Sequence, residues 1–202
     1  AGGRNSRDVA AISPSGEVRV LASAFEGKKL NSPNDCFVAV DGSIYFTDPH
    51  YGLAGRPQEQ PVEGVYRLMP DGSVTRIIDD MVRPNGLYLS ADGTTLYVAD
   101  SEEDKIRAYP LLEDGSVGPG RDFAVLTEAQ GGPDGMAVDV RGNLYCAANG
   151  ILVFDPEGNH LGTIQVPEVP ANCTFGGPDN RTLYITARHS LYRIRLTMPG
   201  LR

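Results

Sequence analysis

The sequence predicts an all-β fold, a β-propeller, on three observations. A short motif places an Asn or Asp directly before an apolar run, and it recurs at Ser32-Pro33-Asn34-Asp35, Arg83-Pro84-Asn85-Gly86 and Gly132-Pro133-Asp134-Gly135, with a weaker copy around Asn172. The copies are roughly 40–50 residues apart, which is the length of one propeller blade. Each copy is followed by short apolar runs separated by Asp-Gly or Pro-containing turns, so one repeat has the pattern of four antiparallel strands.

Alternating apolar residues and turn signals predict the individual strands. Residues 1–7 are polar and are expected to be irregular, and residues 22–30 are expected to be a connection. The predicted strands are 9–12 and 18–21, then 36–40, 43–47, 64–68 and 74–78, then 87–89, 95–99, 105–109 and 121–126, then 136–140, 144–147, 151–154 and 161–166, and finally 173–175, 183–186 and 191–196. We therefore expect one propeller domain over residues 1–202, with blade boundaries near 31–80, 81–130, 131–170 and 171–198, and almost no helix.

Composition narrows the classes of partner. The net charge of −8 disfavours nucleic acid and anionic membrane surfaces, which attract basic patches. No apolar run approaches the roughly 18 residues of a membrane-spanning helix. The three cysteines, Cys36, Cys146 and Cys173, form no CxxC motif, and we expect them to be free thiols within the core.

The repeated Asn and Asp predict a site. In a propeller the first strand of each blade lines the central channel, and neighbouring strands run in opposite directions. The starts of the first strands should therefore meet at one mouth of the channel, bringing together Asn34, Asn85, Asp134 and Asn172. Amide and carboxylate oxygens without Cys or His suit a hard cation such as Ca²⁺ or Mg²⁺. The alternative is that these motifs are ordinary turns, in which the same residue types are common.

Several segments resemble one family. Residues 30–35 together with Tyr45-Phe46-Thr47-Asp48-Pro49-His50-Tyr51-Gly52 are similar to the signature of the gluconolactonase/regucalcin (senescence marker protein) family, and the later landmarks are 84–87, 96–100, 133–136 and 175–178. The resemblance implies a six-bladed propeller, of which about four blades are visible here, with one divalent metal at the channel mouth. It implies that Asn85 and Asp134 are metal ligands and that Asn34 approaches the metal or the substrate.

The resemblance also implies hydrolysis of sugar-acid lactones, with the metal polarising the carbonyl and activating water. Ca²⁺ is the expected ion, with Zn²⁺, Mg²⁺ and Mn²⁺ as alternatives. Asp134 is the expected ligand and general base, and His50, Tyr51 and Asn172 are expected to contact the substrate. Two other functions stay open: a phosphotriesterase-like hydrolase on the same metal propeller, and a non-catalytic propeller that serves as a binding platform.

The order of strands raises a further expectation. The chain opens with the outer strands of a blade and shows no Glu-Gly-Pro motif, the source of another metal ligand in the family, so we expect the N-terminal blade to be absent. An open blade edge predicts self-association and low activity for residues 1–202 alone. The expected partner is a small lactone, with neither nucleic acid nor membrane. The expected location is the cytoplasm, with the periplasm or secretion as alternatives.

Overall fold

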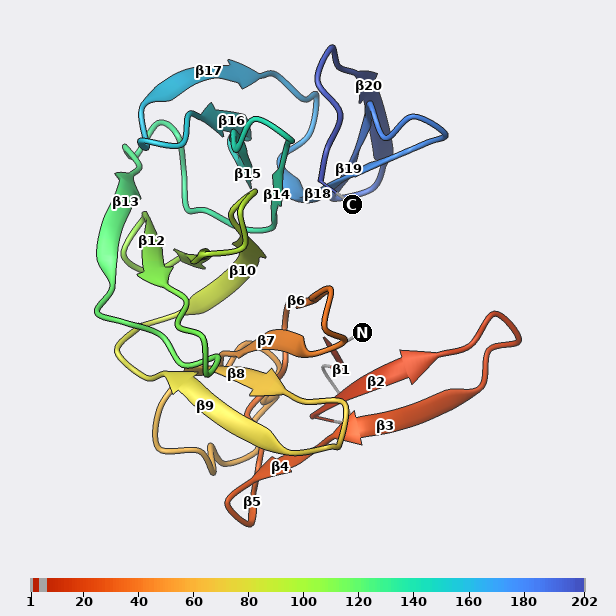
Figure 1. The fold of residues 1–202 in the computed structure, drawn as a ribbon, viewed down its shortest axis with the longest axis vertical. Helices are drawn as coiled ribbons and strands as arrows, with labels where there is room; N and C mark the ends of the chain where they lie inside the picture. The colour runs from red at the N-terminus through yellow and green to blue at the C-terminus, as the bar shows by residue number, and fades with distance from the viewer. Residues whose placement is uncertain (1, 4–6, 202) are drawn as a thin grey trace. The chain divides into compact units, whose positions relative to one another are not determined.

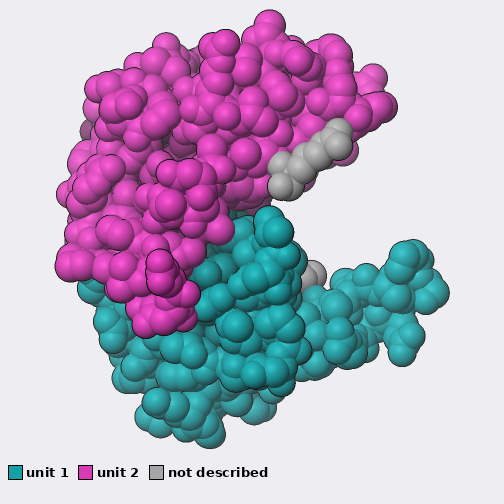
Figure 2. Space-filling view, in the orientation of Figure 1, with its two compact units in different colours: residues 1–87 teal, residues 88–202 magenta. Residues whose placement is uncertain are grey.

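A computed structural model describes residues 2–3 and 7–201, and these form strands, turns and loops without any helix. The described residues therefore hold no helix that is long and apolar enough to cross a membrane. The chain forms two compact units, residues 1–87 and residues 88–202, coloured separately in Figure 2.

The first unit contains a three-stranded sheet, a short hairpin and a four-stranded sheet (Figure 1). Its strands are β1 (Gly2–Gly3), β2 (Asp8–Ile12), β3 (Val18–Ala22), β4 (Ala24–Phe25), β5 (Lys28–Lys29), β6 (Cys36–Val38), β7 (Ile44–Asp48), β8 (Gly64–Leu68) and β9 (Val74–Ile78). Strands β6 to β9 pair in sequence order and are antiparallel, which is the arrangement predicted for one blade.

Two predictions for the start of the chain were wrong. Gly2 and Gly3 were expected to be irregular, but they pair with β2 as strand β1. Residues 22–30 were expected to be a plain connection, but β4 and β5 form a hairpin in which Ala24 pairs with Lys29. Strands of two residues carry no alternation of apolar and polar side chains, so the sequence pattern does not mark them.

The second unit contains the remaining sheets, and β10 crosses the boundary between the units. The strands are β10 (Pro84–Leu89), β11 (Thr95–Asp100), β12 (Lys105–Pro110), β13 (Arg121–Val125), β14 (Met136–Val138), β15 (Leu144–Ala148), β16 (Gly150–Phe154), β17 (His160–Ile164), β18 (Pro170–Gly176), β19 (Thr182–Ala187) and β20 (Leu191–Arg195). They form four-stranded sheets β10–β13 and β14–β17 and the three-stranded sheet β18–β20, each in sequence order.

Strands β6 and β14 end two residues earlier than predicted. The N–H of Ala39 bonds to the carbonyl of Ser43, and the N–H of Asp139 bonds to the carbonyl of Asn143. These bonds close the hairpin turns, so the apolar residues that follow, Val40 and Val140, belong to turns and are exposed. The apolar pattern therefore overestimated both strands.

Buried aromatic and aliphatic side chains hold each unit together. In the first unit, the rings of Phe46 and Tyr66 stack with their centroids 5.3 Å apart, and Phe25 meets Tyr66 edge-on. Aromatic pairs of this kind add about 0.5–1.5 kcal/mol beyond area burial.

The three cysteines differ in burial. Cys146 and Cys173 lie in the core of the second unit, whereas Cys36, in the first unit, is only partly buried. All three thiols are free, as predicted.

Asp-Gly turns connect β6 to β7, β8 to β9 and β10 to β11, and another lies between β12 and β13. In each of these turns the Asp carboxylate accepts a hydrogen bond from the backbone N–H two residues ahead, and the Gly has positive φ. Asp71, for example, accepts from the N–H of Ser73 at 2.9 Å and from its hydroxyl at 2.7 Å. The prediction that these segments are simple hairpin turns is confirmed for Asp41, Asp71, Asp92 and Asp114.

Candidate functional site

In the first unit, Asn34 and Asn85 meet side by side. The N–H of Asn34 bonds to the carbonyl of Thr47 at 2.9 Å, which sets the start of the blade's first strand against the end of its second. The Thr47 hydroxyl then donates to the backbone carbonyl of Asn85 at 2.8 Å. The side-chain amide of Asn34 donates to the Oδ1 atom of Asn85. Asn85 is buried, with 7% of the residue exposed. Two copies of the repeated motif are therefore brought together.

A buried carboxylate positions the loop ahead of Asn34. Asp48 accepts the N–H of Asn31 and the N–H of Ser32, both at 2.7 Å, and it is fully buried. Burial raises the pKa of Asp48 to about 6, against the opposing effect of these two backbone donors. The side chain of Asn31 in turn donates to the carbonyl of Val62 at 3.1 Å. This network fixes the backbone that delivers Asn34.

Four polar side chains form a second cluster, which includes Arg83, two residues before Asn85. The ring of His50 is hydrogen-bonded through Nδ1 to the carboxylate of Glu63. The backbone N–H of His50 donates to the same carboxylate at 3.1 Å. On the other side of the ring, Nη2 of Arg83 lies 3.4 Å from Nε2 of His50. The Arg83 guanidinium also covers the ring of Tyr51, 5.6 Å from its centroid. The cluster therefore joins the segment that follows β7 to the residue before β10.

The sequence pattern identified His50 and Tyr51 but missed Glu63 and Arg83. Arg83 stands directly before the repeated Pro-Asn, so the motif itself carried a signal for it. Glu63 stands directly before the third strand of its blade, where nothing periodic marks it. Only the fold shows that these residues meet.

In the second unit, Asn172 lies against the segment that carries Asp134. The N–H of Asp134 bonds to the carbonyl of Ala147 at 2.8 Å, and the N–H of Gly135 bonds to the carbonyl of Ala171 at 3.0 Å. A Cβ atom on Gly135 would lie 2.1 Å from Cγ of Asn172, so the missing side chain makes room for the amide. The strand starts of two neighbouring blades are thus adjacent here as well.

The donor set fits a hard cation by its chemistry. Asn34, Asn85 and Asp134 offer amide and carboxylate oxygens, the ligands that Ca²⁺ and Mg²⁺ prefer. A half-turn of the Asn34 amide would direct its oxygen where its nitrogen now meets Asn85. Within residues 2–3 and 7–201, no group of three or more His, Cys, Asp or Glu side chains is arranged to hold a metal ion. The predicted set contains only one such side chain, so it is a different kind of site.

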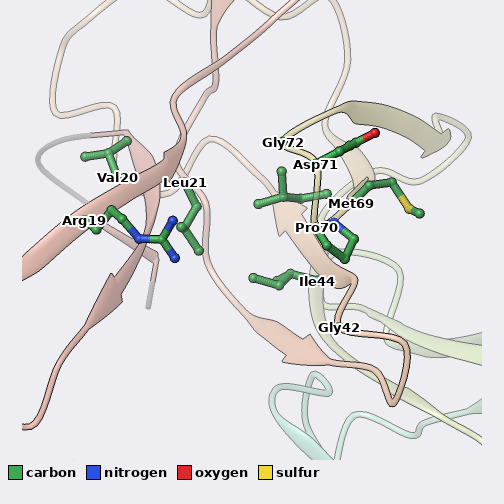
Figure 3. A pocket seen from close by; sticks show the side chains of 10 residues that line it. Arg19, Val20, Leu21, Gly42, Ile44, Met69, Pro70, Asp71 and Gly72 are labelled. Atoms are coloured by element: carbon green, nitrogen blue, oxygen red, sulfur yellow. The ribbon is translucent and has the colours of Figure 1, made fainter.

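The first unit also has a pocket of about 300 Å³ away from these residues (Figure 3). It lies where β3 faces the Asp-Gly turns of the neighbouring sheet, and Leu21 and Ile44 face each other across it. Its lining is Arg19, Val20, Leu21, Gly42, Ile44, Leu68, Met69, Pro70, Asp71 and Gly72. None of the predicted site residues contributes to this pocket.

Comparison with known proteins decides the family. Residues 4–189 match the model of the SMP-30/gluconolactonase/LRE-like region. The chain belongs to this family. It is 41% identical to a gluconolactonase of Zymomonas mobilis, over 87% of the chain and 53% of that protein. It is 32% identical to a regucalcin of Xenopus laevis, over 84% of the chain and 59% of that protein. The chain thus spans little more than half the length of these curated relatives.

A solved structure confirms the fold class. The gluconolactonase of Xanthomonas campestris matches with a TM-score of 0.88 and 37% identity, over 99% of this chain and 67% of that one. The family and the β-propeller fold predicted from the repeated motifs are therefore both confirmed.

Proposed function

We propose that the protein hydrolyses a sugar-acid lactone with the help of one divalent cation. The observation that carries this proposal is the 41% identity to a gluconolactonase over most of the chain. The meeting of Asn34 with Asn85, two of the repeated motif residues, supports it. The proposal concerns the substrate class and leaves the identity of the sugar open.

The chemistry requires few groups. Water adds to the lactone carbonyl carbon, the bond from that carbon to the ring oxygen breaks, and the ring oxygen takes up a proton, which leaves a hydroxy acid that ionises to its carboxylate. A divalent cation, when bound, polarises the carbonyl and makes water a better nucleophile. We propose Asn34, Asn85 and Asp134 as its ligands, because all three offer oxygen. Ca²⁺ fits this set best, and Zn²⁺, Mg²⁺ and Mn²⁺ are the alternatives to test.

Asp134 has a second role in this proposal. It is the carboxylate among the four repeated Asn and Asp residues, so it is also the group best suited to accept the proton of the attacking water. A carboxylate beside a cation holds a proton weakly, so its contribution as a ligand should exceed its contribution as a base. His50, Tyr51 and Asn172 are proposed to contact the hydroxyl groups of the substrate.

The experiment is a titration of chelator-treated protein with Ca²⁺, Zn²⁺, Mg²⁺ and Mn²⁺, followed by calorimetry and by proton release from glucono-δ-lactone. The expected result is saturable binding of one ion together with lactone opening that depends on that ion. Hydrolysis of a phosphotriester in place of the lactone would indicate the phosphotriesterase-like alternative. A flat calorimetric trace and no hydrolysis would favour a binding platform. Sedimentation over a range of protein concentrations tests the predicted self-association.

A further inference from the structure

Arg83 is held from two sides in the first unit. Its Nη2 atom faces Nε2 of His50 at 3.4 Å, and its guanidinium covers the ring of Tyr51 at 5.6 Å from the centroid. A guanidinium over an aromatic face is attracted by the ring's quadrupole. These two contacts restrict a side chain that otherwise has many rotamers, so the guanidinium is pre-organised.

The contacts of His50 give it a positioning role toward Arg83, in addition to the substrate contact proposed above. Glu63 receives both the backbone N–H of His50 and the bond from Nδ1, and Glu63 is the more buried partner, 12% exposed against 40% for His50. With Nδ1–H donating to the carboxylate, Nε2 carries the lone pair of a neutral imidazole. Arg83 has only donors, so it can bond to Nε2 in this tautomer alone. The three side chains therefore form a chain of contacts in which Glu63 orients His50 and His50 orients Arg83.

Arg83 is also close in the sequence to a proposed ligand residue. It stands two residues before Asn85, at the bend that leads into β10. Residues 47–50 contact residues 83–85 at two points, since the Thr47 hydroxyl donates to the Asn85 carbonyl and His50 lies against Arg83. A guanidinium presents N–H donors in a fork that matches the two oxygens of a carboxylate. The reaction proposed above turns a neutral lactone into a carboxylate, so an anion forms in this neighbourhood.

We propose that Arg83 is the anion-recognition residue of the site and binds the carboxylate of the opened sugar acid, with His50, Glu63 and Tyr51 holding its guanidinium in place. This inference rests on the proposed lactonase function for the identity of the anion. It predicts that the protein binds an aldonate more tightly than an uncharged polyol of the same length, and that Arg83 is the cause.

The test measures binding of sodium gluconate by calorimetry to the wild-type protein, Arg83→Gln and Arg83→Lys, with sorbitol as the uncharged probe. Loss of a hydrogen bond to a charged group predicts gluconate binding about ten- to a hundredfold weaker in Arg83→Gln. Arg83→Lys keeps the charge but loses the fork, so its affinity should lie between the other two. Sorbitol should bind equally to all three. Gluconate affinity within twofold of wild type in a folded Arg83→Gln variant would overturn the inference.

Arg67 offers a matched control in the same unit. It covers the ring of Tyr45 at 5.7 Å and donates to Asp41 at 2.8 Å, so it too is an arginine held by a ring and a polar partner. It lies on β8 opposite Tyr45, and its partner Asp41 belongs to an Asp-Gly turn. Arg67→Gln should leave gluconate affinity unchanged, and an equal loss in this variant would contradict a specific role for Arg83.

A double-mutant cycle tests the positioning role of His50. His50→Gln should weaken gluconate binding several-fold while Arg83 is present and by a smaller factor in the Arg83→Gln background, where only its proposed contact with the hydroxyl groups is lost. Additive losses would mean that His50 acts independently of Arg83 and would overturn that part of the inference.

Parallel lactone assays separate the two proposals. Lactone opening with Arg83-independent gluconate binding overturns only this inference, whereas Arg83-dependent binding without lactone opening supports it and overturns the lactonase proposal.

Discussion

Asp and Asn side chains form different kinds of hydrogen bond at the two ends of a blade. One end carries the Asp-Gly turns and is called the turn end; the other is where the first strand starts and is called the strand-start end. At the turn end, Asp71 bonds to Ser73, two residues ahead in its own turn. At the strand-start end, the amide of Asn34 bonds to Asn85, 51 residues away. A side chain that bonds within its own turn stabilises that turn, whereas one that bonds across blades depends on the whole fold. Substitutions at the turn end should therefore change stability alone, and those of the proposed site residues at the strand-start end should change activity.

The carboxylates differ in their titration as well. The hydroxyl and the N–H of Ser73 hold the pKa of Asp71 below its usual value. Asp48, at the strand-start end, has its pKa raised by burial, to about 6. An exposed carboxylate with local donors stays ionised at neutral pH, while a buried one is close to titrating. Five substitutions and one control variant test whether the two ends of a blade differ in this way.

Asp134→Ala and Asn85→Ala should have the largest effect. Each should lower cation-dependent lactone hydrolysis by on the order of a hundredfold or more, because each removes a proposed ligand. Circular dichroism should show that both variants remain folded. Asp92→Ala is the control at the turn end, where the carboxylate bonds to Ser90 and Thr94, and its activity should stay within about twofold of wild type.

The two ligand variants should also differ from each other. Removal of the negative charge of Asp134 should cost more cation affinity than removal of the neutral Asn85 amide, since the cation attracts a carboxylate more strongly. Calorimetric titration of both variants measures this difference. Wild-type activity in Asp134→Ala would be incompatible with the proposed site.

Asp48 should give the next largest effect, on the pH dependence of stability. The pKa of Asp48 is about 6 in the folded protein, whereas the ordinary value for an Asp carboxyl is 3.8. Between these two pH values the folded state therefore binds more protons than the unfolded state. The contribution of Asp48 to the free energy of unfolding should therefore rise as the pH falls through 6, and it approaches about 3 kcal/mol below pH 3.8. Above pH 6 this contribution is absent.

Asp48→Asn isolates that contribution. The amide does not titrate, so the difference in unfolding free energy between wild type and variant should change steadily between pH 7 and pH 4. Urea denaturation at a series of pH values measures the difference, and carboxylates with lowered pKa values, such as Asp71, are common to both proteins. A pH-independent difference would show that Asp48 is already ionised well below pH 6.

Much of the fold could be predicted because its signals are local. Alternating apolar residues and Asp-Gly turns marked Gly64–Leu68 and Val74–Ile78 with the bounds that the structure has. Strand β10 was harder, since Pro84, Asn85 and Gly86 are typical turn residues. They nevertheless belong to the strand that pairs with β11, and Pro84 is tolerated as its first residue.

The candidate site could be predicted only where it repeats. Asn34 and Asn85 share a motif, so the repeat revealed both. Glu63 contacts His50 across 13 residues, and Arg83 contacts it across 33, without any period that links them. Such contacts arise from the pairing of strands and the order of blades, and a pattern within one segment carries no information about them.

Gly135→Ala should have a smaller, selective effect at the strand-start end. The new Cβ atom would lie 2.1 Å from Cγ of Asn172, so the amide must move. Its bond to the N–H of Cys173, now 2.7 Å long, would be lost. Because a side-chain end can move cheaply, stability should fall by only about 1 kcal/mol, whereas KM for the lactone should rise if Asn172 contacts the substrate. An unchanged KM would remove Asn172 from the site.

Gly72→Ala makes the same chemical change at the turn end and should have the smallest effect on function. Gly72 has a φ of +89° and no neighbouring atom within 4 Å of an added Cβ, so the cost comes from the backbone and not from contacts. An alanine in this left-handed region costs about 1 kcal/mol, which lowers the melting temperature by roughly 2–4 °C in a chain of this size. Asp71 and Ser73 would keep their bonds, because the turn retains its register. Lactone hydrolysis and cation affinity should match wild type, measured at a temperature where both proteins are fully folded. If Gly72→Ala lowered activity at that temperature as much as Gly135→Ala does, the two ends of the blade would not be functionally distinct.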